Sequence, residues 1–221
     1  MGKRILLVEG NDDRHVMWNL FEVRNVAECF DVKCPESQSE TYEDGGIDNL
    51  LGSIPYWLAS SDLERLAIVV DADSVGPDAR WEAIRHRLEK AGYDGLPARH
   101  SQCGAVFDLS LQPHTPRSVR FGLWIMPDNQ STGMLEDFVA KMIHEGDEML
   151  PPVDGFLASI PQESRRFSPA HQSKARLHTW LAVSERPGRP MGQAIKADRY
   201  LDANHASVEP FLSWLREALV D

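Results

Sequence analysis

The sequence has 221 residues, of which 42% are hydrophobic and 26% are charged, and this is the composition of a globular protein. The balance excludes an intrinsically disordered or collagen-like chain, and no apolar run approaches the roughly 20 residues that cross a bilayer. The three cysteines, Cys29, Cys34 and Cys103, form no Cys-x-x-Cys pair, so neither a disulfide framework nor a zinc–thiolate site is expected. Residues 1–4 show no secretion signal, so the expected compartment is the cytoplasm, with no membrane association.

The net charge of −11 argues against a surface that coats nucleic acid, because contacts with phosphate require lysine and arginine. The charge is unevenly distributed along the chain. Residues 163–196 contain seven basic and two acidic residues, a net charge of +5, so the rest of the chain carries −16. A basic segment beside an acidic body is compatible with a metal-assisted phosphate site. An exposed helix face followed by a basic loop is the simpler alternative, and composition leaves both open.

Short apolar runs in the first half of the chain predict the strands of a sheet. They lie at residues 5–8, 27–34, 66–70 and 121–126. After three of these runs, apolar residues recur at the spacing of a helix, and the predicted helices begin at Asn11, Pro77 and Met134. Alternation of strand and helix is typical of an α/β fold with a mainly parallel, Rossmann-like sheet, right-handed crossovers and helices on both faces.

Other segments complete the predicted organisation. Residues 47–58 have the apolar spacing of a helix, although Pro55 is expected to kink or break it. Residues 36–45 are polar and end in two glycines, so a loop is expected there. Three later helical segments lie at residues 156–160, 175–183 and 208–219. We therefore expect an α/β domain over residues 1–149 and an α-helical extension over residues 150–221, packed together as one compact unit.

Acidic residues follow the predicted strands directly. They are Glu9, Asp71, Asp73 and Asp128, and Glu136 lies at the start of the next helix. The carboxyl ends of parallel strands share one edge of an open α/β sheet, where ligands bind. Carboxylates that converge there repel one another unless a cation lies among them, and hard oxygen ligands suit Mg²⁺ or Mn²⁺. Asp71 and Asp73 are expected to share one ion, because residues two apart on a strand point to the same side.

Each acid also has a purely structural interpretation. A single acid after a strand is usually a turn former or a helix cap, and Asp-x-Asp turns are common. The order of the motifs is more specific than any one of them. A first strand ends in Glu-Gly, a second in Asp-x-Asp and a third in Asp-Asn, and Gly-x-x-Glu then opens a helix.

This order resembles the Toprim superfamily, through the segments LLVEGNDD, IVVDADS and IMPDNQSTGMLEDF. Topoisomerases, bacterial primases and nucleases of the overcoming-lysogenization-defect type share that catalytic fold. The spacing is closest to small, stand-alone bacterial Toprim-like proteins of unknown function, which KARLHTWLA also resembles. The resemblance implies a sheet flanked by helices, with metal held by Glu9, Asp71 and Asp73. The motifs of the nuclease branch imply a second-site ligand at Glu136 and a functional lysine at Lys174.

The expected function is divalent-metal-dependent phosphoryl transfer, specifically by a nuclease that hydrolyses phosphodiester bonds with Mg²⁺ or Mn²⁺. Glu9 would hold metal or act as general acid or base, and Glu136 with Asp128 would complete a second metal site. Lys174 would offset phosphate charge in the transition state. The phosphate-binding candidates are Arg165, Arg166 and Arg176. A competing hypothesis is a non-enzymatic, Toprim-derived module that binds a nucleotide or a partner protein.

A phospho-acceptor receiver domain is a further alternative for the N-terminal pattern. Receivers carry an acidic pair directly at the end of the first strand, whereas Glu9-Gly10 here precedes Asp12 and Asp13. The chain is also longer than a receiver, and Asp-x-Asp is not a receiver pattern. The receiver is therefore the weaker hypothesis.

Other residue types suggest structure rather than chemistry. His178 lies four residues from Lys174 on a predicted helix, hence on the same face, and a core or surface role is expected for it rather than a catalytic one. Base stacking is a known use of tryptophan, but core packing explains five of the six tryptophans better. They are Trp18, Trp81, Trp124, Trp180 and Trp214.

Overall fold

The computed structural model describes residues 2–35, 46–94, 96–110, 118–197 and 200–221. A five-stranded sheet has the order β2–β1–β3–β5–β4. The strands are β1 (Lys3–Leu7), β2 (Asp31–Lys33), β3 (Leu63–Asp71), β4 (Ala105–Ser110) and β5 (Ser118–Met126). Only β4 is antiparallel to its neighbour, so the predicted mainly parallel α/β fold is confirmed. The loop expected at residues 36–45 lies outside the described residues.

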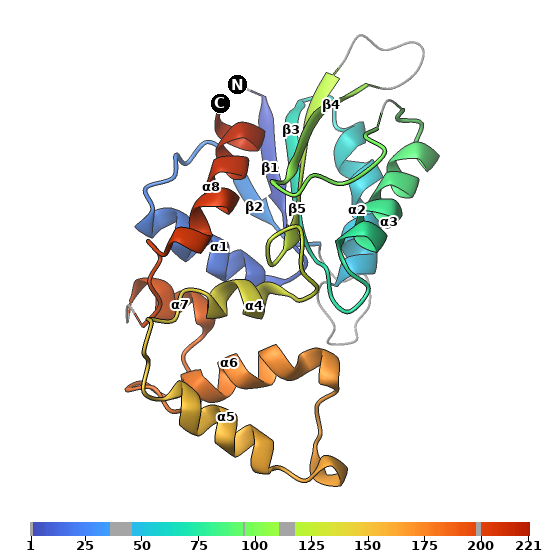
Figure 1. Cartoon of the computed structure of the whole chain (residues 1–221). Helices are drawn as coiled ribbons and strands as arrows, with labels where there is room; N and C mark the ends of the chain where they lie inside the picture. The colour runs from blue at the N-terminus through green and yellow to red at the C-terminus, as the bar shows by residue number, and fades with distance from the viewer. Residues whose placement is uncertain (1, 36–45, 95, 111–117, 198–199) are drawn as a thin grey trace.

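Helices cover both faces of the sheet (Figure 1). The α-helices of the described residues are α1 (Asn11–Val23), α2 (Ile47–Ala59), α3 (Pro77–Lys90), α4 (Leu135–Ala140), α5 (Leu150–Ser159), α6 (Gln172–Ala182), α7 (Met191–Lys196) and α8 (Glu209–Leu215), of which α5 and α6 lie away from the sheet. Successive residues of a strand point to opposite faces. Ile5 and Leu7 therefore pack under α2 and α3, whereas Leu6 and Val8 pack with α1, α4 and α8. Within the described ranges, no helix is both long and apolar enough to cross a membrane.

Helix α2 continues through Pro55, so of the predicted kink or break at this residue, the break is wrong. A proline inside a helix costs about 3 kcal/mol through its missing amide and its ring. Here Leu50, Leu51, Ile54 and Leu58 are buried against the sheet, and Pro55 itself lies on the exposed side. Burial of this apolar face offsets the local cost.

Four of the five tryptophans expected in the core are buried there. They are Trp81, Trp124, Trp180 and Trp214, each at most 5% exposed. Trp18 is 45% exposed, so the prediction for this residue is wrong. The buried face of α1 is formed by Val16, Met17, Leu20 and Phe21, and Trp18 lies outside that stripe.

The C-terminal helix shares its core with the sheet. Helix α8 continues as a π-helical turn, Arg216–Val220, which packs against β3, β5 and β1 (Figure 1). A Cβ atom on Gly122 of β5 would lie 2.7 Å from the Ala218 side chain, so glycine at this position permits the close approach. The expected helical extension is thus joined to the α/β core through one continuous apolar cluster.

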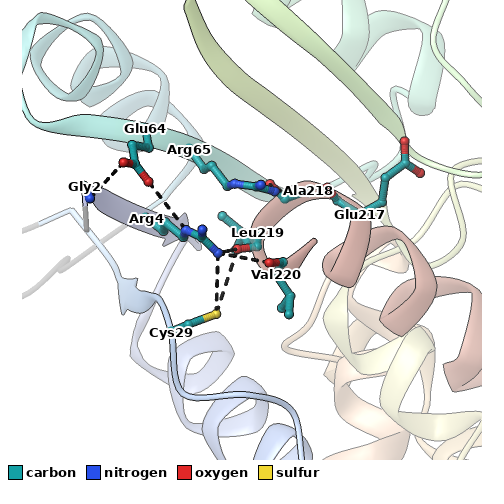
Figure 2. Close-up of polar contacts among 9 residues, drawn as sticks. All are labelled: Gly2, Arg4, Cys29, Glu64, Arg65, Glu217, Ala218, Leu219 and Val220. Atoms are coloured by element: carbon teal, nitrogen blue, oxygen red, sulfur yellow. Dashed lines mark hydrogen bonds and ion pairs between the residues drawn. The ribbon is translucent and has the colours of Figure 1, made fainter.

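A row of three arginines binds the end of this helix, and Figure 2 shows two of them, Arg4 and Arg65. Arg4, Arg65 and Arg120 are register partners on β1, β3 and β5. Arg4 Nη1 donates to the carbonyl oxygens of Leu219 at 2.9 Å and Val220 at 3.0 Å. Arg65 and Arg120 donate to carbonyl oxygens just before these. The last carbonyl groups of a helix have no hydrogen-bond donor within the helix, and they carry partial negative charge. The arginines donate hydrogen bonds to these carbonyl groups, and their positive charge balances the partial negative charge.

Replacing Arg4 by alanine is expected to lower the free energy of unfolding by about 2 kcal/mol, because hydrogen bonds from charged donors contribute about 1.5–3 kcal/mol. The Arg4 side chain is only 14% exposed, so water replaces its contacts poorly. Urea denaturation measures the change. Arg85→Ala is the control, since Arg85 makes exposed contacts with Glu82 and Glu89. Equal losses in the two variants would contradict the role of the arginine row.

Candidate acidic site at the carboxyl edge of the sheet

Glu9 and Asp71 meet at the carboxyl ends of two neighbouring strands. Glu9 follows β1, and Asp71 is the last residue of β3, which pairs with β1 in parallel. The Asp71 amide donates to Glu9 Oε1 at 2.8 Å, and the Leu135 amide at the start of α4 donates to Asp71 Oδ1 at 2.9 Å. In each carboxylate, one oxygen accepts a hydrogen bond from a backbone amide, and the second oxygen can bind another group.

Two further acids complete what we call the acidic cluster: Glu9, Asp13, Asp71 and Glu136. Burial, followed by the charges of Glu9 and Glu136, raises the pKa of Asp13 to about 7. Burial and the charges of Glu9, Asp13 and Glu136 likewise raise the pKa of Asp71 well above its usual value. Burial also raises the pKa of Glu9, against the hydrogen bond from the Asp71 amide. Burial and mutual repulsion therefore make ionisation of Glu9, Asp13 and Asp71 unfavourable without a cation.

The sequence pattern does not single out Asp13 as a site residue. In the sequence it is one of two acids in the first turn of a helix, where acids commonly favour the helix dipole. The sequence feature that indicates its place in the site is its position four residues after Glu9, across a tight strand-to-helix connection at Gly10. Such a connection keeps the first helical turn close to the end of the strand.

Glu136 is 3% exposed and is paired with two residues of α6. Lys174 Nζ lies 3.1 Å and His178 Nε2 lies 3.8 Å from Glu136 Oε1. Burial acts to raise the pKa of Glu136, but His178 and Lys174 outweigh it and lower the pKa. Burial acts to lower the pKa of Lys174, but the charge of Glu136 and the hydrogen bond to it outweigh burial, so the pKa of Lys174 is raised. Helix α6 thus delivers a protonated amine to the acidic cluster.

Asp73 is oriented differently from the sequence expectation. Strand β3 ends at Asp71, and Asp73 has a φ of +50°, so strand alternation no longer applies there. Its backbone pairs with that of Gly133 at 2.7 and 3.0 Å, and its carboxylate is bound by Arg80. Gly133 has a φ of +136°, a backbone conformation that favours glycine, and a Cβ atom there would also lie 2.7 Å from the Asp137 carboxylate. Asp73 lies beyond the end of β3, and its charge still contributes to raising the pKa of Asp71.

Asp128 forms the turn after β5. Its carboxylate accepts hydrogen bonds from the amides of Gln130 and Ser131 and from Lys141 Nζ at 2.7 Å. Burial acts to raise the pKa of Asp128, but the hydrogen bonds from Lys141, Ser131 and Gln130 lower it. Among the described residues, no hydrogen bond or ion pair joins Asp128 to the acidic cluster.

The three arginine candidates for phosphate binding lie on or before α6. Arg176 pairs with Asp154 of α5 at 2.6 and 2.9 Å. Arg165 donates to carbonyl oxygens at the end of α5, and its guanidinium lies over the Phe167 ring. Arg166 is exposed. In the described structure, no hydrogen bond or ion pair connects these arginines to the acidic cluster.

Within the described ranges, no three His, Cys, Asp or Glu side chains are placed so that they could hold a metal ion as they stand. Glu9 and Asp71 each direct one oxygen to a backbone amide, and Asp73 faces Arg80. The chemistry of the donors nevertheless suits a hard cation, because all are carboxylates and three have raised pKa values. Binding of a divalent cation would require side-chain adjustment and release of protons.

Without metal, the free energy of unfolding is expected to fall between about pH 4 and pH 7, through Asp13. An unfolded aspartate ionises near pH 4, whereas folded Asp13 retains its proton up to about 7. The folded state therefore binds more protons across this range, and stability falls as the pH rises. Asp13→Asn is expected to raise stability at pH 8 by up to about 4 kcal/mol.

Urea denaturation in EDTA at several pH values measures this difference between the variant and the wild type. The comparison is necessary because Glu136 has a lowered pKa and contributes in the opposite direction. Asp108→Asn, a change at an exposed residue of β4, is the matched control. Parallel pH profiles for Asp13→Asn and the wild type would contradict the pKa of about 7.

Comparison with known proteins identifies the family of the chain. A family model described as "Protein of unknown function (DUF3226)" matches residues 3–220. No curated protein and no solved structure gives a match. The matched region contains the whole sheet, the acidic cluster and helix α6. The chain therefore belongs to the DUF3226 family.

Proposed function

We propose that this protein is a divalent-metal-dependent phosphoryl-transfer enzyme, a nuclease that hydrolyses phosphodiester bonds. The observation that carries the proposal is the contact of Lys174 with Glu136 at the acidic cluster. It places carboxylates suited to Mg²⁺ or Mn²⁺ next to an amine suited to a phosphate oxygen. The Toprim resemblance of the same segments supports this reading. The cytoplasm is the proposed compartment, where the three free thiols would remain reduced.

The residues of the cluster have distinct proposed roles. Glu9, Asp13 and Asp71 would hold the cation, which supplies Lewis acidity and lowers the pKa of bound water. Lys174 would donate a hydrogen bond to a phosphate oxygen and offset its developing charge. Glu136 would orient the Lys174 ammonium group, and its charge, by raising the pKa of Lys174, keeps that group protonated. Catalysis would then depend on fixed charges at a partly buried site.

The distribution of charge indicates the side from which a polyanion would approach. The net charge of −11 repels nucleic acid from most of the surface. The basic segment 163–196 contains α6, which carries Lys174 to the cluster. Arg166 is exposed in the connection before α6. A phosphate backbone would therefore meet this segment first, and binding would weaken with added salt.

A cleavage assay tests the proposal. Single-stranded and double-stranded oligonucleotides of DNA and RNA are incubated with the protein and Mg²⁺, Mn²⁺ or EDTA. The expected result is cleavage of at least one substrate with metal and none with EDTA. Absence of metal-dependent cleavage for all substrates would overturn the proposal. Nucleotide binding without cleavage would favour the alternative of a non-enzymatic binding module.

A further inference from the structure

A groove of about 440 Å³ lies between α1 and the edge strand β2. Its apolar lining includes Phe21, Phe30 and Val32, and the rings of Phe21 and Phe30 meet edge to face at 5.7 Å. Trp18 stands at the rim, 45% exposed, with the Arg14 guanidinium 5.0 Å from the centre of its ring. A groove of this size with an aromatic lining is typical of binding sites.

The polar part of the groove is acidic. Three exposed acids, Glu22, Glu28 and Asp31, line it, and no lysine or arginine is among the described residues that do so. Glu22 pairs with Lys196, and Asp31 lies 3.7 Å from Lys33. Both are pairs of half-exposed or exposed side chains, which contribute little to stability. The cations of a partner can therefore replace these lysines at small cost.

Among the described residues, the groove runs along the outer edge of the sheet. Strand β2 is at the end of the sheet, with β1 beside it on one side. Val8 directly follows β1, and its amide donates a hydrogen bond to the carbonyl oxygen of Lys33 at 2.9 Å, so the carbonyl group of Lys33 points toward β1. Backbone groups alternate in direction along a strand of a parallel pair, so those of Val32 point away from β1. A segment in the groove would meet the apolar lining and this backbone together, which favours a peptide over a small molecule.

We propose that this groove binds an extended, basic segment of a partner protein. An aliphatic or aromatic side chain of the segment packs on Phe21 and Phe30, and its lysine or arginine residues face Glu28 and Asp31. Its main chain lies beside Val32. A second copy of this chain is a poorer occupant, because two bodies of net charge −11 repel each other. This interaction is independent of the acidic cluster and of the proposed nuclease activity.

Selection of peptides tests the proposal. A display library of random twelve-residue peptides is panned against the folded, full-length protein, and an enriched peptide is synthesised for titration by fluorescence anisotropy. We expect enriched sequences with lysine or arginine around an apolar residue. Trp18→Ala and Glu28→Lys are each expected to weaken binding at least about tenfold, through loss of apolar area and reversal of charge. Both positions are exposed at the groove, so circular dichroism is expected to show an intact fold.

The matched controls are Tyr56→Ala, at a side chain that is 76% exposed on α2, and Glu145→Lys, at an exposed acid outside the groove. Both are expected to bind the peptide like the wild type. Four results would overturn the proposal: no enriched peptide, enriched peptides that are acidic or uncharged, equal binding by all variants, or a dimer in sedimentation that Glu28→Lys dissociates. The last result would identify a second copy of the chain as the occupant.

Discussion

Asp71→Asn is expected to reduce metal-dependent phosphodiester cleavage by about 10³-fold, because it removes a carboxylate charge from the cation site. Asparagine retains the oxygen that accepts the Leu135 amide, so the connection from β3 to α4 persists. The substitution also relieves repulsion from Glu9 and Asp13, so the metal-free variant is expected to unfold at a higher temperature than the wild type. Initial rates at saturating Mn²⁺ and thermal unfolding in EDTA measure the two effects.

Asp108→Asn is the control for this substitution, because the Asp108 side chain is exposed on β4. It is expected to change neither the cleavage rate nor the unfolding temperature. Retained cleavage by Asp71→Asn would remove Asp71 from the proposed metal ligands. A metal-free Asp71→Asn protein that unfolds at a lower temperature than the wild type would contradict the repulsion inferred from the raised pKa.

Lys174→Ala is expected to reduce the cleavage rate by about 10²–10³-fold, the usual effect of removing one electrostatic contact from the transition state. The contact lies beside a nearly buried carboxylate, where solvent screens charge weakly. The loss is expected in kcat at saturating metal and substrate, and Lys174→Arg, which keeps the charge, is expected to recover part of it. Single-turnover rates separate this effect from substrate binding.

Lys141→Ala is the matched control for Lys174→Ala. Lys141 also pairs with a carboxylate, that of Asp128 at 2.7 Å, but in the turn after β5. Its removal is expected to affect stability and to leave the cleavage rate of the folded protein unchanged. Arg166→Ala is expected to weaken substrate binding broadly and to reduce its dependence on salt. Equal rate losses in Lys174→Ala and Lys141→Ala would contradict the proposed contact of Lys174 with the phosphate in the transition state.

The sequence predicts the centre of the sheet better than its edges. Strands β1, β3 and β5 are covered on both faces, so each contains a continuous apolar run that is visible without a structure. Strand β4 has only Ala105 and Leu109 buried, and its mixed pattern gave no prediction. Strand β2 has three residues and was predicted too long. Edge strands need less burial, so their sequences contain a weaker signal.

The site was predictable where strand order determines it. Glu9 and Asp71 meet because they follow neighbouring parallel strands, and each follows a recognisable apolar run. The orientation of Asp73 was not predictable, because it depends on a left-handed backbone conformation and on pairing with Gly133. No local pattern indicates that α6 packs on α4, and the position of Lys174 followed only from a family resemblance. Contacts between distant helices depend on tertiary packing.

Binding of a divalent cation by the acidic cluster is the central claim, and thermal unfolding of EDTA-treated protein with added Mn²⁺ or Mg²⁺ tests it most directly. A cation that binds only the folded state stabilises it by about 2.7 kcal/mol at a hundredfold excess over the dissociation constant. For a chain of this length, the melting temperature is expected to rise by about 5–10 °C. Glu9→Gln and Asp71→Asn are expected to lose most of this rise, whereas Asp108→Asn retains it. A melting temperature that does not respond to millimolar Mn²⁺ or Mg²⁺, or an equal rise in all three variants, would contradict the claim.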